Sequence, residues 1–317
     1  DFMMQMEDQL PLKGFEQVRL SEVDNLAFFR RTSDRDSRSA KRVNAAISQF
    51  PSIEQDGYAW PVMIYTLGRF SLLLKGQPAD FGRKVPHKPL EFLKTLIALG
   101  GREVSASSMT SALWPDVDGD TAQRSFDTTL YRLRKILDDE RVLTLRDGRL
   151  SLDSRYCWVD VWAFERLLGQ VQRIRSRDAT GRDAARLDLL TDRMFSLYQH
   201  HFLAREDMTS WSVSLRERLR SKFIYNLLDV GSYWEIHGFW ERAVQCYHKG
   251  LEVDDLIEVF YQRIMICSLE TRRISEGMSA YRRCRQILSV VLGLKPEPET
   301  ESLYIALKNA RMSKQSA

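Results

Sequence analysis

Residues 121–152 read TAQRSFDTTLYRLRKILDDERVLTLRDGRLSL, and this stretch decides the fold. At about 100° per residue, its first half places apolar side chains within one arc, which predicts a helix over 121–137 with a buried face. Two short alternating runs follow, Val142 to Leu145 and Arg149 to Leu152, on either side of Arg146-Asp147-Gly148. An Asp-Gly pair between such runs is a strong signal of a tight β-hairpin. The apolar face of the helix comprises Ala122, Phe126, Thr129, Leu130, Leu133, Ile136 and Leu137.

Short β-type runs and two helices are expected before this stretch. Gly68 and the segment Gly76-Gln77-Pro78 supply turn residues, which predicts a small antiparallel sheet. The order along the chain is therefore sheet, three helices and hairpin, the order of a winged helix-turn-helix domain. The expected elements are strands Val62–Leu67 and Phe70–Leu74, a helix from Pro89 to Gly100, and a helix capped by Ser105 or Ser107 and ended by Pro115.

The outer face of the third helix is the candidate site. A helix fits the major groove of DNA, where arginine can donate two hydrogen bonds to guanine and threonine or tyrosine can reach bases or phosphates. The alternative is an amphipathic helix whose outer face is merely hydrated. The following hairpin favours DNA binding, because a basic tip can enter a neighbouring minor groove, although arginine beside Asp147 is also common on solvated turns. The candidate DNA-binding residues are Arg124, Asp127, Thr128, Tyr131, Arg132 and Lys135 on the helix, and Arg146 and Arg149 on the hairpin.

From Trp158 onward the sequence reads as helical, and part of it repeats. The tetratricopeptide pattern W-x2-L-G-x2-Y…A-x3-F fits residues 227–247, and its period of about 34 residues leads to a degenerate second copy. Stacked helix pairs of this kind offer concave surfaces for protein partners, including a second copy of the chain. The matching positions are Leu227, Val230, Gly231, Trp234, Ala243 and Tyr247, then Tyr261, Ile264, Met265, Ser268, Gly277 and Tyr281.

The composition is that of a soluble globular chain with two domains of ordinary size. The 317 residues are 44% hydrophobic, and the formal net charge of +4 is too small to argue for a nucleic-acid partner by itself. No uninterrupted apolar run approaches the roughly 18 to 20 residues of a membrane span, so no membrane partner is expected. The start of the chain lacks a signal-peptide pattern. Four cysteines without ligand spacing lie in apolar helical pattern, which favours a reducing cytoplasm: Cys157, Cys246, Cys267 and Cys284.

Residues 1–61 are the least informative segment. Basic residues from Arg30 to Arg42 alternate with Ser, Thr and Asp, which predicts a solvated linker or N-terminal extension. These cations could instead touch phosphates. We therefore expect an unassigned segment over 1–61, a winged-helix domain over 62–155 and an all-α, tetratricopeptide-like domain over 156–317. The whole chain should be mainly α with a small β component.

The sequence contains no P-loop, G-x-G-x-x-G, H-E-x-x-H or G-x-S-x-G motif, so neither catalysis nor a cofactor is expected. The acidic cluster Asp138–Glu140 follows the third helix and is typical of a solvated turn rather than a metal site. His200 and His201 are adjacent, and on a helix they would point about 100° apart, so they would not easily share a metal. Three tryptophans are expected in the core, with the lining of a peptide or effector site as the alternative: Trp211, Trp234 and Trp240.

Several segments in this order resemble one known family. The chain from residue 62 to 317 resembles an OmpR-type winged helix joined to a bacterial transcriptional activator domain, as in SARP-type regulators. The segments are Leu67-Gly-Arg-Phe70, Ser111-Ala-Leu-Trp-Pro-Asp116, Thr128-Thr-Leu-Tyr-Arg-Leu-Arg134, Trp158-Val-Asp-Val-Trp-Ala-Phe-Glu165, Leu215-Arg-Glu-Arg-Leu219, Trp240-Glu-Arg-Ala-Val244 and Leu292-Gly-Leu-Lys-Pro-Glu-Pro-Glu-Thr300.

The resemblance implies a transcriptional activator that binds repeated sites on double-stranded DNA and contacts RNA polymerase. Asp127 departs from the family pattern, because relatives often have a basic residue at this place in the recognition helix. A different class of function is a protein-interaction scaffold of helical repeats whose winged helix no longer binds DNA. The two differ in salt response, since a protein that neutralises phosphates loses affinity steeply as salt rises.

Overall fold

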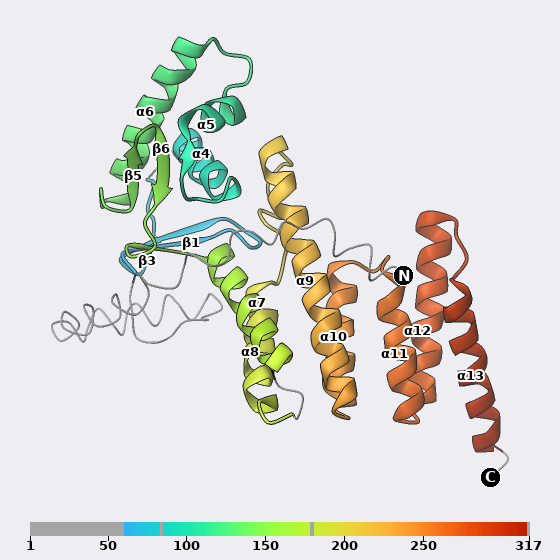
Figure 1. Cartoon of the computed structure of the whole chain (residues 1–317). Helices are drawn as coiled ribbons and strands as arrows, with labels where there is room; N and C mark the ends of the chain where they lie inside the picture. Colours follow the sequence, from blue (N-terminus) through green and yellow to red (C-terminus); the bar gives the residue numbers. More distant parts are fainter. Residues whose placement is uncertain (1–59, 83–84, 178–180, 316–317) are drawn as a thin grey trace.

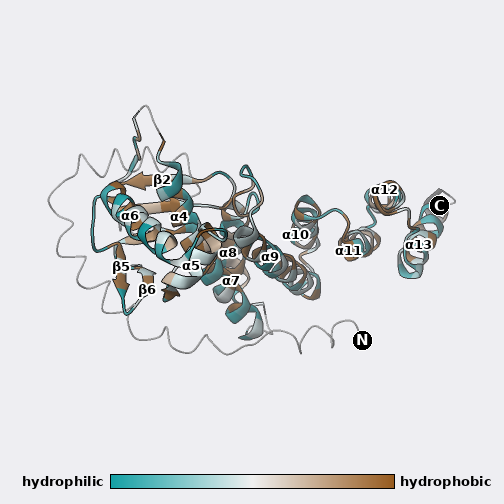
Figure 2. Ribbon diagram, turned by 90° about the horizontal axis from the view of Figure 1, so that it is seen from above, coloured by the Kyte–Doolittle hydropathy of each residue, from teal (hydrophilic) through white to brown (hydrophobic). Residues whose placement is uncertain are grey.

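The computed structural model describes residues 60–82, 85–177 and 181–315, so the prediction for residues 1–61 falls almost wholly outside it. Figure 1 shows an elongated molecule, with a small unit of strands and helices at one end of a row of helices. The view from above in Figure 2 shows the later helices following one another away from that unit. The predicted fold class, mainly α with a small β component, is confirmed.

A four-stranded sheet opens the described part of the chain. Strand β1 (Val62–Tyr65) pairs antiparallel with β2 (Ser71–Leu74), and β3 (Gln77–Pro78) lies beside β2. Strand β7 (Cys157–Val159) pairs parallel to β1, which gives the order β3-β2-β1-β7. The prediction of helix from Trp158 onward is therefore wrong at β7, and Cys157 is not in helical pattern. Three residues are too few to show a period, and the pairing with β1 makes them a strand.

Three helices follow the first strands: α4 (His87–Ala98), α5 (Ala106–Leu113) and α6 (Gly119–Leu137). The N-cap of α5 is Ser105, whose hydroxyl accepts a hydrogen bond from the backbone N–H of Ser108 at 3.0 Å. The ring centroids of Phe92 and Phe126 lie 5.3 Å apart, and neither ring is exposed. This contact packs α4 against α6 and holds the third helix in place.

The predicted hairpin is present directly after α6. Strands β5 (Leu143–Arg146) and β6 (Arg149–Leu152) pair across a two-residue turn, and β4 (Val104–Ser105) adds a third strand beside β6. Asp147 and Gly148 have φ angles of 48° and 70°. Positive φ at both turn residues matches the right-handed twist of the flanking strands, which is why Asp-Gly favours this turn.

The rest of the described chain is helical, and the helices pack side by side (Figures 1 and 2). Its elements are α7 (Asp160–Arg177), α8 (Ala184–Leu197), α9 (Ser210–Ile236), α10 (Trp240–Val253), α11 (Glu258–Glu270), α12 (Ile274–Ile287), the π-helical turn η3 (Leu288–Leu292) and α13 (Pro298–Gln315). Over the described residues, none of the helices is long and apolar enough to cross a membrane.

The predicted repeat positions lie where these helices meet. Gly231 on α9 faces the ring of Tyr247 on α10 so closely that an added Cβ would overlap the ring. At Gly277 on α12, an added Cβ would come within 2.8 Å of Leu307 on α13 and 3.0 Å of Ser268 on α11. The small residues thus allow the close helix approach that the tetratricopeptide-like pattern predicts.

The core accounts for the cysteines and tryptophans singled out in the sequence. All four cysteines are free and buried. Trp234 is 2% exposed, and Trp211 and Trp240 are partly buried against the same core. Trp234 is therefore a core residue, and the other two support the core from its edge.

The β-rich half and the helical half share one continuous hydrophobic core. A backbone bridge joins Leu67, just after β1, to Phe202. Beside it, the N–H of Gly68 donates to the carbonyl of His201 at 2.9 Å, and the N–H of Leu203 donates to the carbonyl of Thr66 at 2.7 Å. The two halves are thus joined as one body, and the predicted boundary at residue 155 falls before β7, which belongs to the first sheet.

Asp160, at the start of α7, strengthens this joint. Its side chain is 1% exposed, and its Oδ2 accepts from the N–H groups of Thr66 and Leu67 at 2.5 and 2.6 Å. Its Oδ1 accepts from the Thr66 hydroxyl at 2.6 Å and from the N–H of Val161 at 2.8 Å. Burial raises the pKa of Asp160 to about 6, against the opposing effect of these hydrogen bonds. The carboxyl group satisfies backbone donors at the end of β1 that would otherwise be buried without a partner.

Candidate nucleic-acid interface

Helix α6 carries most of the candidate DNA-binding residues, and side chains fix both of its ends. Asp118 caps the N-terminus by accepting from the N–H of Thr121 at 3.1 Å, and hydrogen bonding from Thr121 lowers the pKa of Asp118. At the C-terminus, Asp138 has a φ of 52°, in the left-handed region that ends a helix. The buried face is the predicted one, with Ile136 half-buried at its edge: Ala122, Phe126, Thr129, Leu130, Leu133 and Leu137.

The opposite face of α6 is exposed at all six predicted positions: Arg124, Asp127, Thr128, Tyr131, Arg132 and Lys135. Tyr131 is 59% exposed, and the Nζ of Lys135 lies 4.6 Å from the centroid of its ring. An exposed aromatic ring beside a cation suits an anionic polymer, because the ring can stack or pack on sugar while the cation meets a phosphate. No described residue covers these six side chains.

Arg134 connects α6 to the hairpin that follows it. Its Nε donates to the backbone carbonyl of Leu143 in β5 at 3.3 Å. Arg134 is not among the candidate DNA-binding residues, and its contact shows that it positions the hairpin. This hydrogen bond ties the candidate surface of α6 to the hairpin.

The tip of the hairpin carries two cations opposite each other. Arg146 and Arg149 are cross-strand partners, and both side chains are exposed. Like charges directly opposite each other are destabilising. The guanidinium of Arg149 donates to the carbonyl of Glu103 at 3.1 Å, which draws it toward the third strand. A phosphate group at the tip would relieve the remaining repulsion.

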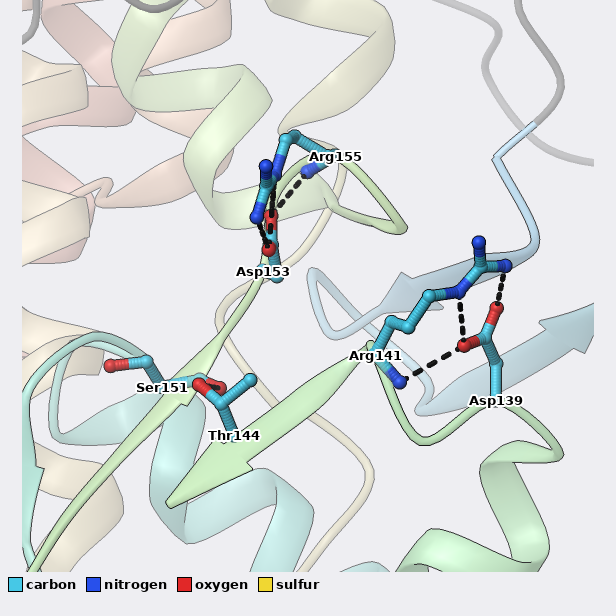
Figure 3. A network of polar contacts seen from close by, with 6 residues as sticks. All are labelled: Asp139, Arg141, Thr144, Ser151, Asp153 and Arg155. Carbon is cyan, nitrogen blue, oxygen red and sulfur yellow. Dashed lines mark hydrogen bonds and ion pairs between the residues drawn. The ribbon is translucent and has the colours of Figure 1, made fainter. Parts of the chain in front are cut away.

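Two Asp-x-Arg pairs brace the base of the hairpin (Figure 3). The carboxylate of Asp139 accepts from the backbone N–H of Arg141 at 3.0 Å and from its guanidinium at 2.9 and 2.7 Å. Asp153 and Arg155 repeat this arrangement on the other strand, with a shortest contact of 2.6 Å. Both guanidinium groups also lie over the ring of Tyr156, at 4.3 and 5.6 Å from its centroid. Sequence reasoning missed this brace, although the repeated Asp-x-Arg spacing on either side of the hairpin could have signalled it.

The acidic cluster takes part in ion pairs, and the histidine pair lies outside the helices. Asp138 forms an exposed ion pair with Lys75 at 2.7 Å, and hydrogen bonding from Arg141 lowers the pKa of Asp139. His200 and His201 lie in the loop after α8, so their placement on a helix is wrong. In the part of the chain that the structure describes, no group of three or more His, Cys, Asp or Glu side chains could hold a metal ion.

The architecture combines a helix-turn-helix and a β-hairpin wing with stacked helix pairs. Residues 159–308 match the family described as the bacterial transcriptional activator domain. The match covers just under half of the chain, so the helical half is similar to a bacterial transcriptional activator domain.

The fold is also similar to that of a solved structure, Mycobacterium tuberculosis EmbR in complex with a low affinity phosphopeptide. The two chains are 18% identical, with a TM-score of 0.60, and the similarity covers 81% of this chain and 69% of EmbR. This likeness confirms the arrangement of a winged helix and a helical domain. The search of curated proteins finds no match.

Proposed function

We propose that this protein binds specific sequences of double-stranded DNA and activates transcription by contacting RNA polymerase in the bacterial cytoplasm. The observation that carries the proposal is the exposed face of α6, held by Arg134 beside a hairpin with Arg146 and Arg149 at its tip. A helix of this kind inserts in the major groove while the wing reaches the backbone or the minor groove. The family match supports the activator role. Contact with RNA polymerase follows from the resemblance to SARP-type regulators, and the proposal requires no cofactor.

The test is selection of bound duplexes from a random pool with the full chain, followed by a salt series on the enriched sequence. A DNA-binding regulator should enrich one motif, and its affinity should fall roughly 100-fold between 50 and 200 mM salt if it neutralises about four phosphates. The alternative function is a protein-interaction scaffold, and the stacked helix pairs of α9 to α12 support it. A scaffold of this kind should give neither an enriched motif nor a steep fall of affinity with salt.

Arg124 is expected to read a base. Its replacement by alanine should weaken binding by about 1 to 3 kcal/mol and relax the preference at one position of the motif. Fluorescence anisotropy with the enriched duplex and its single-base variants measures both effects. Arg186→Ala, which removes an exposed cation from α8, is the matched control. Unchanged affinity and selectivity for both Arg124→Ala and Arg132→Ala would falsify the assignment of α6 as the recognition helix.

The wing is expected to position the protein more than to specify sequence. Replacing Arg146 and Arg149 together by alanine should weaken all duplexes to a similar extent and flatten the slope of log K against log salt by about 2. Binding to the enriched and to a scrambled duplex across salt concentrations checks this. Arg282 and Arg285, exposed on α12, give a double-alanine control. A loss confined to one sequence contradicts the positioning role.

We also propose that two copies bind repeated half-sites as a homodimer. The helical half offers stacked helix pairs for a second copy, and the shared core transmits that pairing to the winged helix. Binding of the full chain to duplexes with one and with two half-sites should show a gain from the second site, because linkage raises its effective concentration. Equal affinity for both duplexes would contradict the proposed pairing of two copies. The helical half would then be better explained as a sensor of an effector or partner.

A further inference from the structure

Asp127 stands out on the candidate recognition face because it is the one carboxylate among the six exposed residues assigned there. Its neighbours on this face include Arg124, one turn before it, and Tyr131, one turn after it. A phosphate backbone attracts the cations of this face and repels a carboxylate. Asp127 therefore weakens a purely electrostatic contact with DNA.

The contacts of Asp127 in the structure do not explain why a carboxylate stands at this position. The residue is exposed and lies more than two turns inside α6, beyond the first turn where the helix dipole favours an acidic residue. Within the described residues it takes part in no ion pair, even with nearby Arg124. Its one recorded bond is from the side-chain amide of Gln123, at 3.2 Å to Oδ1. Such pairs four residues apart stabilise a helix only slightly.

The bond from Gln123 orients the carboxylate and leaves Oδ2 free to accept another hydrogen bond. In the major groove, cytosine N4 and adenine N6 are the base amines that donate. Adenine places the acceptor N7 beside N6, which repels a carboxylate, whereas cytosine presents no acceptor of its own next to N4. Building on the proposed DNA binding, we propose that Asp127, positioned by Gln123, reads a cytosine in the major groove and gives the binding site a preferred C·G pair.

The spacing of Asp127 and Arg124 locates this base pair. The two residues are three positions apart on α6, a rise of about 4.5 Å along the helix axis. Base pairs follow one another at about 3.4 Å. The C·G pair should therefore lie within about two base pairs of the position whose preference is relaxed in Arg124→Ala.

The experiment is selection from a random duplex pool with the full-length protein and with Asp127→Asn and Asp127→Ala, followed by competition binding on single-base variants. The wild type should prefer C·G over the other pairs at one position by roughly tenfold, within the range for a good base contact. Asp127→Ala should lose that preference while binding other sequences as well or better, because a repelled charge is gone. Asp127→Asn should shift the preference toward A·T, since asparagine pairs with adenine N6 and N7.

Asp120→Asn is the matched control, because it removes one exposed carboxylate from the same helix. It should leave every base preference unchanged, and far-ultraviolet circular dichroism should show that all variants remain helical. If the wild type enriches a motif that the Asp127 variants also enrich unchanged, the base-reading role is wrong and DNA binding stands. If the wild type enriches no motif, the proposed function fails and the role of Asp127 fails with it.

Discussion

Replacing Asp160 by alanine is expected to lower the free energy of unfolding by about 3 to 5 kcal/mol, because several buried donors lose their acceptor at once. The N–H groups of Thr66 and Leu67 would face the cavity left by the carboxyl group. Thr66 is buried and Leu67 is half-buried, so the N–H of Thr66 would lose its acceptor without gaining contact with bulk water. Urea unfolding followed by circular dichroism measures the loss.

The Asp160→Asn variant tests the loss of hydrogen bonds without the cavity that alanine would leave. Asparagine keeps the shape of the side chain but places an amide N–H₂ where one carboxylate oxygen accepts from two backbone N–H groups. It should therefore be destabilising as well, by less than alanine. Asp188→Asn, a change in a half-buried residue of α8 away from this joint, is the comparison. An Asp160→Ala variant with wild-type stability would show that Asp160 does not hold the joint.

The second large effect is expected at Gly250, where α10 meets α11. In an exposed helix, replacing glycine by alanine stabilises by roughly 1 kcal/mol. At Gly250 the added Cβ would overlap the fully buried ring of Phe260, and at Gly231 it would overlap the ring of Tyr247. Overpacking of this kind destabilises by about 1 to 3 kcal/mol, and each variant should lower the midpoint of thermal unfolding.

Gly169 provides the matched control for these glycines. It lies inside α7, and an added Cβ there would meet nothing within 4 Å. Gly169→Ala should therefore raise the stability by up to roughly 1 kcal/mol. If Gly250→Ala and Gly231→Ala behave like Gly169→Ala, the helices can separate without loss and the glycines are not needed for close packing.

The sequence predicts most of the first half because its signals are local. The face of α6, the Ser105 cap and the Asp147-Gly148 turn depend on residues close together in the chain, and the structure contains each of them. The glycine and tyrosine positions of the repeat are equally local, since a helix pair spans one period.

Other features could not be predicted because their cause lies far away in the sequence. Strand β7 exists through its pairing with β1, and Asp160 at the start of a helix looks like an ordinary capping residue. At the candidate site, the wheel of α6 predicts which side chains are exposed. It does not predict that Arg134 reaches the backbone of β5, since that contact depends on how the hairpin folds back.

The parallel pairing of β1 with β7 has a consequence for how the protein folds during its synthesis on the ribosome. Val62 and Cys157 are partners in this pairing, and the bridge from Leu67 reaches Phe202. Contacts between residues so distant in sequence form slowly, because a long loop must close before they are made. The local pairing of β1, β2 and β3 can form early, but the pairing of β1 with β7 must wait until residues 157–159 have been synthesised. The N-terminal unit therefore completes its sheet only after the strand that begins the helical half is available.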